Sequence, residues 1–265
     1  MASGLSQVKH IVAIGAGKGG VGKSSVTALV AMALQKKGYS VGVLDLDLYG
    51  PSIGKMFKAG IIPTPYEDGI LPAEGAGLKL MSIAFFHQGL DVNFVRAPIA
   101  NGIVMQFLHR VFWGELDYLL MDCPPGTSDI HMTVMQEVAL SGALLVTTPQ
   151  EVAILDVRKA CQMFIKMQVP VLGVVENMCY YEAGGQLFYP FGPSSFDRLA
   201  EEFAVRRLCQ IPILDRISWL MDRGIDGQED HDLLVERLMP VADELVLLLA
   251  GKKRVHDFAG QWNQP

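Results

Sequence analysis

The sequence predicts an α/β protein with a doubly wound, mostly parallel sheet and helices on both faces of that sheet. Short aliphatic and β-branched runs alternate with longer segments of helical periodicity, which is typical of parallel strands joined by helices. A glycine-rich loop joins the first apolar run to the first helical segment, as in a strand–loop–helix unit. The 265 residues are 50% hydrophobic, which is enough to build one sizeable core.

The expected strands and helices alternate along the chain. Residues 8–15, "VKHIVAIG", form the first buried strand. The helix over residues 24–38 has apolar residues at helical spacing, and Gly38 at its end suits a helix C-cap. A second strand covers residues 39–47. Further strands are expected at 78–85, 116–122, 142–148 and 169–177, and further helices at 98–112, 129–140 and 151–167.

Two stretches depart from this alternation. Residues 60–77 are rich in glycine and proline, and we expect them to form a long surface excursion rather than a linker between domains. From residue 193 onward helices are expected to predominate, ending in the segment "PVADELVLLLAGKKR". This helical C-terminal part, over about 193–255, is expected to belong to a single domain that spans residues 1–265.

Charge, hydropathy and cysteine content argue against several classes of protein. The formal charge of −6 argues against a protein whose main activity is to bind nucleic acid or an anionic membrane. No apolar run reaches the roughly 18 to 20 residues of a bilayer-spanning helix, so we expect no stable membrane insertion. The cysteines are widely spaced without C-x-x-C, and no apolar signal segment precedes them, which predicts reduced thiols and a cytoplasmic location. These cysteines are Cys123, Cys161, Cys179 and Cys209.

The glycine-rich loop matches the phosphate-binding pattern G-x-x-x-x-G-K-[ST], from Gly17 to Ser24. Glycines let backbone N–H groups turn toward phosphate oxygens, where the positive end of the helix dipole adds to the field. Lys23 is expected to reach the β- and γ-phosphates of a nucleotide, and Ser24 to ligate Mg²⁺. The alternative, an incidental glycine-rich turn, is disfavoured by the strand before it and the helix after it. The expected nucleotide-binding residues are Gly17, Lys18, Gly19, Gly20, Val21, Gly22, Lys23, Ser24 and Ser25.

Three carboxylates stand where predicted strands end. Asp45 and Asp47 lie in "VLDLDLYGPS" at the end of the second strand, and Asp122 ends the run "YLLMD" before a Pro-Pro-Gly turn. Phosphoryl transfer requires groups that position water and hold the hydration shell of a metal ion, and carboxylates at neighbouring strand ends suit both tasks. Taken alone, each acidic residue is about as well explained as a turn former or helix cap. The phosphate loop favours the catalytic interpretation.

Several separated motifs together resemble a known family. The loop "KGGVGKSS", with its additional Lys18, resembles the deviant Walker-A ATPases, the group that contains MinD, ParA and the nitrogenase iron protein. A narrower resemblance, to the Mrp family of iron–sulfur cluster carrier ATPases, rests on "DLDLYGPSI", "MSIAFF", "QFLHRVFWGELDYLLMDCPPGTSD", "VTTPQEVAILDVRKA" and "VPVLGVVENM". It implies a MinD/ParA-like P-loop fold and slow, Mg²⁺-dependent ATP hydrolysis by a homodimer. It also implies iron–sulfur cluster transfer to apo-proteins, with scaffold proteins as further partners.

The resemblance explains the second lysine of the loop. In this superfamily the early lysine reaches across a dimer interface to the phosphates of the partner's nucleotide, so Lys18 implies an ATP-dependent homodimer. Such a lysine adds positive charge where the transition state spreads negative charge, as an arginine finger does. The alternative is one more exposed lysine. The glycines on both sides of Lys18 disfavour it, because they leave the backbone free to aim the side chain.

The resemblance also implies roles for residues beyond the loop. Asp47 would orient the attacking water, Asp45 would support the hydration shell of Mg²⁺, and Asp122 would hold a metal-bound water. Asn177 resembles the adenine-reading residue of the superfamily, since its amide offers both a donor and an acceptor, and Pro212 resembles the proline beside the base. The alternative for Asn177 is a simple turn residue at a strand end. The expected catalytic residues are Lys18, Lys23, Asp47 and Asp122.

The sequence departs from the family at the expected cluster site. Family members usually present C-x-x-C after "ENM", whereas this chain reads "ENMCYYEAGGQLFYPFG" with Cys179 alone. Two copies of Cys179 would supply only half of the four thiolates that a cluster ordinarily takes. Cys179 is therefore a candidate iron–sulfur ligand whose alternative is a small semi-buried residue near the nucleotide. We also expect no N-terminal accessory domain, and the family's GDxGxP segment is altered to "RGIDGQEDHD".

Three interpretations remain open. The first is an ATP-hydrolysing iron–sulfur cluster carrier, which the density of matching motifs favours. The second is a nucleotide switch derived from that family that binds no cluster, which the missing cysteine pair favours. The third is a spatial regulator like MinD or ParA that acts on a membrane or DNA through a C-terminal amphipathic helix. The apolar part of residues 243–262 is short, however, and predicts a final packing helix with a basic end.

Overall fold

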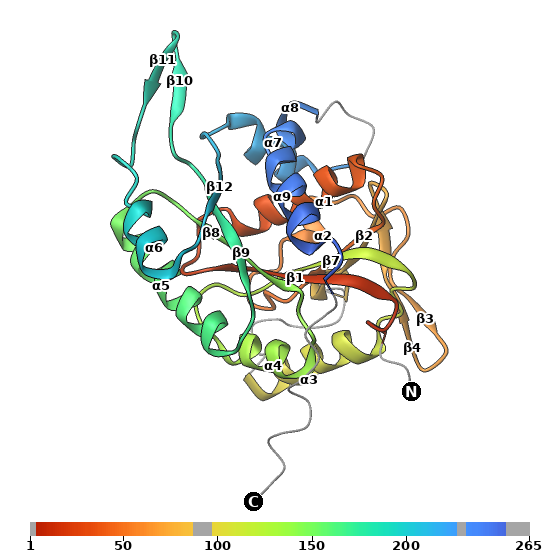
Figure 1. Cartoon of the computed structure of the whole chain (residues 1–265). Coiled ribbons are helices and arrows are strands. Elements are labelled where there is room, and N and C mark those ends of the chain that lie inside the picture. Colours follow the sequence, from red (N-terminus) through yellow and green to blue (C-terminus); the bar gives the residue numbers. More distant parts are fainter. Residues whose placement is uncertain (1–3, 87–96, 227–231, 253–265) are drawn as a thin grey trace, which may run out of the picture.

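A central sheet of eight strands runs through the part of the chain that the structure describes (Figure 1). The computed structural model describes residues 4–86, 97–226 and 232–252. The strand order is β12-β9-β8-β1-β7-β2-β6-β5, and neighbours pair in parallel except β5 with β6. The bounds are β1 Val8–Ala16, β2 Val41–Asp45, β5 Ala73–Gly75, β6 Leu78–Met81, β7 Leu116–Asp122, β8 Gly142–Thr147, β9 Val171–Glu176 and β12 Arg207–Gln210.

Helices cover both faces of the sheet and build two cores. Alternate residues of β1 point to opposite faces, so Ile11 and Ala13 join one core while Val12 and Ile14 join the other. The first core contains residues of α3 (Ala97–Arg110), α4 (Asp129–Glu137), α5 (Glu151–Lys166) and α6 (Phe196–Phe203). The second contains residues of α1 (Lys23–Lys36), α2 (Ile53–Met56), α7 (Asp215–Arg223), α8 (Asp232–Glu236) and α9 (Met239–Leu249).

Parallel pairing brings together the strand ends that carry the predicted carboxylates. Asp45 at the end of β2 lies in register with Asp122 at the end of β7, and Ile14 of β1 lies beside Asp122 on its other side. The loop that follows β1 therefore begins next to both carboxylates, at the carboxyl edge of the sheet where ligands bind in such folds. The loop leads directly into α1, which is buried against the sheet along most of its length.

The structure confirms the predicted class and the order of the long elements. The predictions for the short elements were incomplete. Residues 60–77 are more than a surface excursion, because β3 (Thr64–Tyr66) and β4 (Gly69–Leu71) form a hairpin there and β5 extends the sheet. β12 likewise interrupts the part predicted to be helical from residue 193, and a 3₁₀ helix, η1 (Ile83–Phe86), replaces the end of one predicted strand. β5 and β12 have only three and four residues, and neither shows a clear alternation of apolar and polar side chains in the sequence.

A second hairpin projects from the carboxyl edge of the sheet (Figure 1). It consists of β10 (Tyr181–Ala183) and β11 (Gln186–Phe188), and every residue of both strands is exposed. The rings of Tyr181 and Phe188 face each other across it with their centroids 5.1 Å apart. This hairpin occupies the stretch in which the sequence lacks the C-x-x-C of the family that it resembles.

The C-terminal helix packs against the second core. Val241, Ala242, Leu245 and Leu249 of α9 are buried, as expected for a packing helix. Residues 253–262 of the segment that we considered for membrane targeting lie outside the described residues, as do residues 227–231 of the altered "RGIDGQEDHD" segment. In the three described ranges, no helix is both long and apolar enough to cross a membrane.

Candidate nucleotide-binding site

The glycine-rich loop lines a pocket of about 230 Å³ at the carboxyl edge of the sheet. All predicted loop residues from Lys18 to Ser25 line this pocket, whereas Gly17 does not. The opposite wall comes from the turn after β2, from α2 and from the turn after β7. The lining residues contributed by these segments are Asp47, Ser52, Met56 and Pro125.

Two glycines of the loop are required by its packing. A Cβ on Gly17 would lie 2.2 Å from the carbonyl carbon of Asp156 in α5, so only glycine allows this approach of loop and helix. Gly22 has a φ of +82°, which disfavours other residues, and a Cβ there would lie 2.3 Å from Nδ2 of Asn177. Gly17 therefore shapes the loop from outside the pocket, and Gly22 turns the chain into α1.

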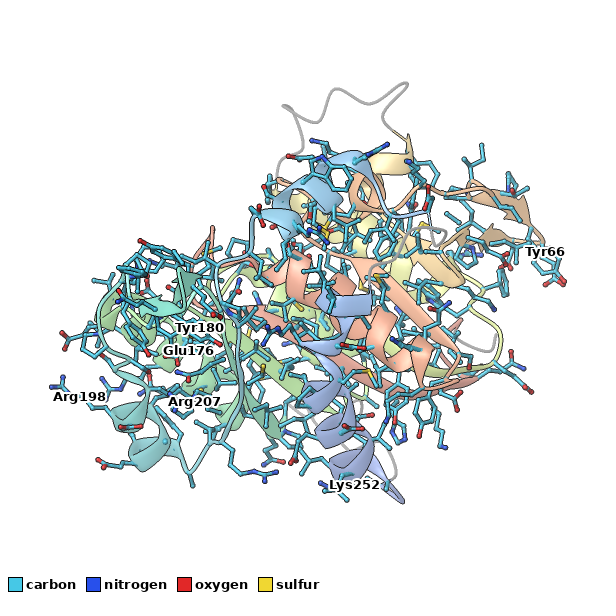
Figure 2. All side chains as sticks on the ribbon, turned by 90° about the horizontal axis from the view of Figure 1, so that it is seen from above. Tyr66, Glu176, Tyr180, Arg198, Arg207 and Lys252 are labelled. Atoms are coloured by element: carbon cyan, nitrogen blue, oxygen red, sulfur yellow. The ribbon has the colours of Figure 1, made fainter. Side chains whose placement is uncertain are left out.

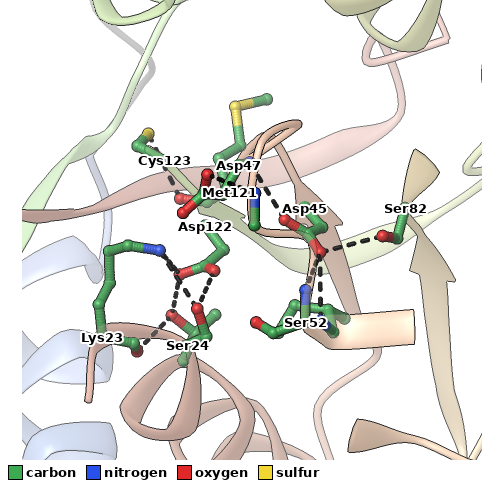
Figure 3. Close-up of polar contacts among 12 residues, drawn as sticks. Lys23, Ser24, Asp45, Asp47, Ser52, Ser82, Met121, Asp122 and Cys123 are labelled. Atoms are coloured by element: carbon green, nitrogen blue, oxygen red, sulfur yellow. Dashed lines mark hydrogen bonds and ion pairs between the residues drawn. The ribbon is translucent and has the colours of Figure 1, made fainter. Parts of the chain in front are cut away.

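Lys23 and Asp122 form a buried ion pair beside the loop (Figure 3). The distance from Nζ to Oδ1 is 2.8 Å, and the two side chains are 7% and 0% exposed. Ser24 Oγ donates a hydrogen bond to Oδ2 of Asp122 at 2.6 Å, and Thr27 Oγ1 lies 2.8 Å from Oδ1. A carboxylate is tolerated in the interior only when it is paired and hydrogen bonded in this way. Asp122 therefore holds the loop lysine and serine in one cluster.

Asp45 organises the turn that follows β2. Its buried carboxylate accepts hydrogen bonds from the backbone N–H groups of Asp47, Ser52 and Ile53, each at 3.1 Å. Ser82, directly after β6, donates a further hydrogen bond from Oγ at 3.0 Å. Burial raises the pKa of Asp45 to about 7 from an ordinary value of 3.8, and the negative charge of Asp122 is the second cause of this rise. Asp45 therefore lies behind the pocket and holds its wall in place.

Asp47 and Lys18 both line the pocket and both are half-buried. Oδ1 of Asp47 accepts a hydrogen bond from the N–H of Gly50 at 3.3 Å. Burial raises the pKa of Asp47, and the charge of Lys23 acts against this rise. Lys18 makes no ion pair with any residue that the structure describes. The charged residues that line the pocket are thus Asp47, Lys18 and Lys23, and Lys23 is already paired with Asp122 behind the wall.

The oxygen atoms around the pocket suit a hard divalent cation such as Mg²⁺. Ser24 and Asp47 line the pocket with a hydroxyl and a carboxylate, and Ser52 adds a buried hydroxyl that has no hydrogen-bond partner among the described residues. Asp122 lies directly behind Ser24, to which it is hydrogen bonded. The described part of the chain holds no group of three or more His, Cys, Asp or Glu residues that could bind a metal ion by themselves. Mg²⁺ is usually held by one or two protein groups together with substrate phosphates, so this sparse oxygen set fits it.

Three functional side chains were missed by the sequence analysis. Thr27 lies four positions after Lys23, on the same face of α1, which is a signal that the helical period could have provided. Ser52 belongs to the quoted segment "VLDLDLYGPS" but was given no role. Ser82 reaches Asp45 across 37 residues of sequence, and no local pattern identifies that contact.

The predicted base-reading residues, Asn177 and Pro212, do not line the pocket, and Asn177 contacts the loop beside it. Nδ2 of Asn177 donates a hydrogen bond to the carbonyl of Val21 at 2.9 Å, and Asn177 is 6% exposed. Pro212 is buried in a segment whose neighbour Ile211 accepts a hydrogen bond from the N–H of Cys179 at 2.9 Å. Asn177 and Pro212 thus belong to two segments that pair with each other, and the segment of Asn177 contacts the loop. Their contact with adenine stays a prediction.

Cys179 is placed as a structural residue. It is 3% exposed, and its thiol donates to the carbonyl of Glu176 at 3.1 Å. Burial raises the pKa of this thiol to about 12, so it is protonated at neutral pH, whereas cluster ligands are thiolates. In the described conformation Cys179 therefore does not fit the role of an iron–sulfur ligand. Cys123 and Cys161 are also buried, and Cys209 is partly buried.

These features define the class of the P-loop nucleoside triphosphatases: a parallel sheet, a phosphate loop after its first strand, and a buried lysine and carboxylates around that loop. Solved structures agree with this class. A nucleotide-binding protein in complex with ADP from Archaeoglobus fulgidus is 38% identical, with a TM-score of 0.72 over 87% of this chain and 92% of that one. The septum site-determining protein MinD with Mg-ADP from Pyrococcus horikoshii OT3 has a TM-score of 0.66 over 91% and 97% of the two chains, and at 22% identity it shows the fold alone.

Within this class, the chain belongs to the ParA family described as NUBPL iron-transfer P-loop NTPase, whose family model matches residues 7–246. The chloroplastic Fe–S cluster assembly factor HCF101 of Oryza sativa subsp. japonica is 42% identical over 84% of this chain and 42% of that protein. The iron–sulfur cluster carrier protein of Aquifex aeolicus (strain VF5) is 44% identical over 82% of this chain and 61% of that protein. The chain thus spans about half the length of these relatives. The matches confirm the resemblance to iron–sulfur cluster carrier ATPases.

Proposed function

We propose that the chain binds and slowly hydrolyses ATP as a homodimer, and that it carries iron–sulfur clusters to apo-proteins. The observation that carries the nucleotide part is the cluster of Lys23, Ser24 and Asp122 at the phosphate loop, with Nζ of Lys23 2.8 Å from Asp122. The cargo part is supported by the names of the relatives, which are an iron–sulfur cluster carrier protein and an assembly factor. A cytoplasmic location is part of the proposal.

The residues around the pocket suit the hydrolysis of a phosphoanhydride. During hydrolysis negative charge gathers on the γ-phosphate oxygens while water attacks in line. Lys23 would bind these oxygens, and the backbone N–H groups of the loop would bind the β-phosphate. Asp47 would orient the attacking water from the opposite wall of the pocket. Mg²⁺ held at Ser24, with Asp45 and Asp122 behind it, would neutralise phosphate charge when bound.

Lys18 and the surface around it support a homodimer. Lys18 lines the pocket without an ion pair in the described ranges, and Lys23 already supplies the lysine of the subunit's own phosphate site. Exposed apolar side chains flank the loop: Tyr49 follows β2, and Val152 and Leu155 lie on the helix that packs on Gly17. A partner subunit that covers the loop would bury apolar side chains at these positions. A two-fold dimer through this face would bring each Lys18 toward the partner's phosphates.

A nucleotide switch that binds no cluster is the second candidate. It is favoured by the burial of the Cys179 thiol and by the absence of cysteine from the hairpin of β10 and β11. Under the carrier proposal, a cluster would need either a rearrangement of residues 177–180 or thiolates from another protein. The two candidates share the same nucleotide chemistry and differ in the cargo.

Anaerobic reconstitution with iron and sulfide separates the two candidates. Visible absorption and iron per dimer are measured for the wild type, Cys179→Ser and the control Cys209→Ser, and ATP turnover is measured on the same samples. Bound iron and sulfide that disappear only in Cys179→Ser would support a cluster held through that thiol. No cluster, with turnover intact, would favour the switch. Absence of ATP turnover in the wild type would contradict the nucleotide part of the proposal.

A further inference from the structure

Glu176 is a buried carboxylate that ends β9, one residue before Asn177, and it does not line the nucleotide pocket. Its side chain is 0% exposed. Oε1 accepts a hydrogen bond from Ser194 Oγ, and Oε2 accepts from Nη1 of Arg207 at 3.1 Å and from Nε2 of Gln210 at 2.8 Å. A buried carboxylate destabilises a fold unless it is fully paired and hydrogen bonded, and this one is held by three donors.

The three donors come from segments far from Glu176 in the sequence. Ser194 lies between the β10–β11 hairpin and α6, and its Oγ also accepts a hydrogen bond from the N–H of Phe196 at 3.1 Å. Arg207 and Gln210 lie on β12, and the guanidinium of Arg207 sits 5.2 Å from the centroid of the Phe196 ring. Figure 2 shows Glu176, Arg207 and Tyr180 on the same side of the molecule. Glu176 thus joins the end of β9 to β12 and to the chain that leaves the hairpin.

The backbone next to Glu176 joins the same network to the phosphate loop. The carbonyl of Glu176 accepts a hydrogen bond from the N–H of Ile211 at 2.8 Å, and the N–H of Cys179 donates to the carbonyl of Ile211 at 2.9 Å. Asn177 then reaches the loop through its 2.9 Å hydrogen bond to Val21. The carboxylate of Glu176 therefore adds side-chain hydrogen bonds from Arg207 and Gln210 to the backbone pairing of β12 with β9. Because β12 ends two residues before Pro212, this contact helps to hold Pro212 in place relative to Asn177.

We infer that Glu176 is a positioning residue for the base end of the nucleotide site, which it serves without touching the nucleotide. By holding the segments of Asn177 and Pro212 in place beside each other, it lets the site bind the base of a nucleotide as well as its phosphates. The inference rests on the proposed function, because it requires the base to lie beside these two residues. A structural role alone would weaken the binding of every ligand of the pocket equally. A positioning role weakens only the binding of ligands that carry a base, because the phosphate contacts come from the loop and not from β9 or β12.

Calorimetric titration with Mg-ADP and with magnesium pyrophosphate tests the inference, because the two ligands share the diphosphate and differ in the nucleoside. The variant Glu176→Gln keeps the size of the side chain and removes its charge. We expect it to bind ADP about tenfold more weakly and pyrophosphate unchanged, which lowers the ratio of the two affinities. The matched control Glu202→Gln removes the exposed ion pair with Arg158, and we expect it to change neither affinity.

A second variant keeps the test decisive if Glu176→Gln does not fold. Gln210→Ala removes one of the three donors to Glu176, and because Gln210 is itself exposed, the variant should fold. We expect it to weaken ADP binding about threefold and to leave the affinity for pyrophosphate unchanged. Equal losses for both ligands, or an unchanged affinity for ADP, would overturn the positioning role. A wild type that binds ADP no more tightly than pyrophosphate would instead overturn the adenine site of the proposed function, and this is seen before any variant is made.

Discussion

Replacing Lys23 by methionine would leave Asp122 as an unpaired carboxylate in the interior. The two side chains are 7% and 0% exposed, and their charged atoms are 2.8 Å apart, so the carboxylate of Asp122 has little access to water. Removal of one partner from a buried ion pair costs about 3–5 kcal/mol of stability. Asp122 would keep its contacts with the hydroxyls of Ser24 and Thr27. We therefore expect a loss near the lower end, about 3 kcal/mol.

Urea denaturation of the nucleotide-free protein measures this loss. Nucleotide and Mg²⁺ are left out because a ligand that binds the folded state would stabilise it by mass action. The control is Lys37→Met, directly after the same helix, which removes the pair of Lys37 with Asp243. The side chains of that pair are 26% and 59% exposed, so we expect a loss of at most about 1 kcal/mol.

A double variant tests the physical reason for the loss. Adding Asp122→Asn to Lys23→Met removes the stranded charge, and we expect it to recover about 1–2 kcal/mol relative to the single variant. The reasoning is refuted if Lys23→Met is no more destabilising than Lys37→Met. It is also refuted if the double variant is less stable than Lys23→Met, because the uncompensated carboxylate would then not be the cause.

Three further predictions concern the pocket. Lys18→Ala should leave ADP binding by each subunit intact but lower ATP turnover and ATP-dependent dimerisation; normal phosphate release in the variant would exclude a role across the interface. Asp47→Asn should bind ATP and hydrolyse it at least about 100-fold more slowly, and a normal rate would assign the water-positioning role to another residue. The pKa of Asp45 rises from 3.8 to about 7 on folding. Between these pH values the folded state keeps a proton on Asp45 that the unfolded chain has lost, so the contribution of Asp45 to stability should fall as the pH rises. In metal-free buffer the free energy of unfolding of the wild type should fall by up to roughly 4 kcal/mol relative to that of Asp45→Asn over this pH range. Parallel plots of unfolding free energy against pH for the two proteins would contradict this prediction. The comparison with the variant also cancels the opposite effect of His131, whose pKa burial lowers to about 4.

The long elements and the phosphate loop could be predicted because their signals are local. Nine residues of β1 and the loop after it lie in one continuous stretch, and the strand–loop–helix geometry follows from that stretch alone. The carboxylates at the ends of β2 and β7 could be placed near the loop because parallel strands present their carboxyl ends at one edge. The strands β5 and β12 could not be predicted, because their residues, AEG and RLCQ, show no clear apolar run or alternation, whereas the four residues of β6, LKLM, do.

The contacts that complete the site come from segments distant in sequence. Thr27 and Asp122 are 95 residues apart, and Asn177 and Val21 are 156 residues apart. The burial of Cys179 also depends on the packing of its neighbours, since its backbone pairs with Ile211. A single thiol in the sequence left open whether it faces solvent as a ligand or the interior as a small apolar residue.

The sequence by itself determined the class of fold, the phosphate loop and the residue types that handle phosphate, because these depend on patterns within short continuous stretches. Only the tertiary structure decided which groups neutralise the buried charges. The fold pairs the buried carboxylate of Asp122 with Lys23, and it pairs that of Glu176 with Arg207 and Gln210. The physical reason is that a buried charge is stabilised by whichever donors the fold brings within hydrogen-bond distance, and that distance is set by sheet order and register and not by sequence spacing.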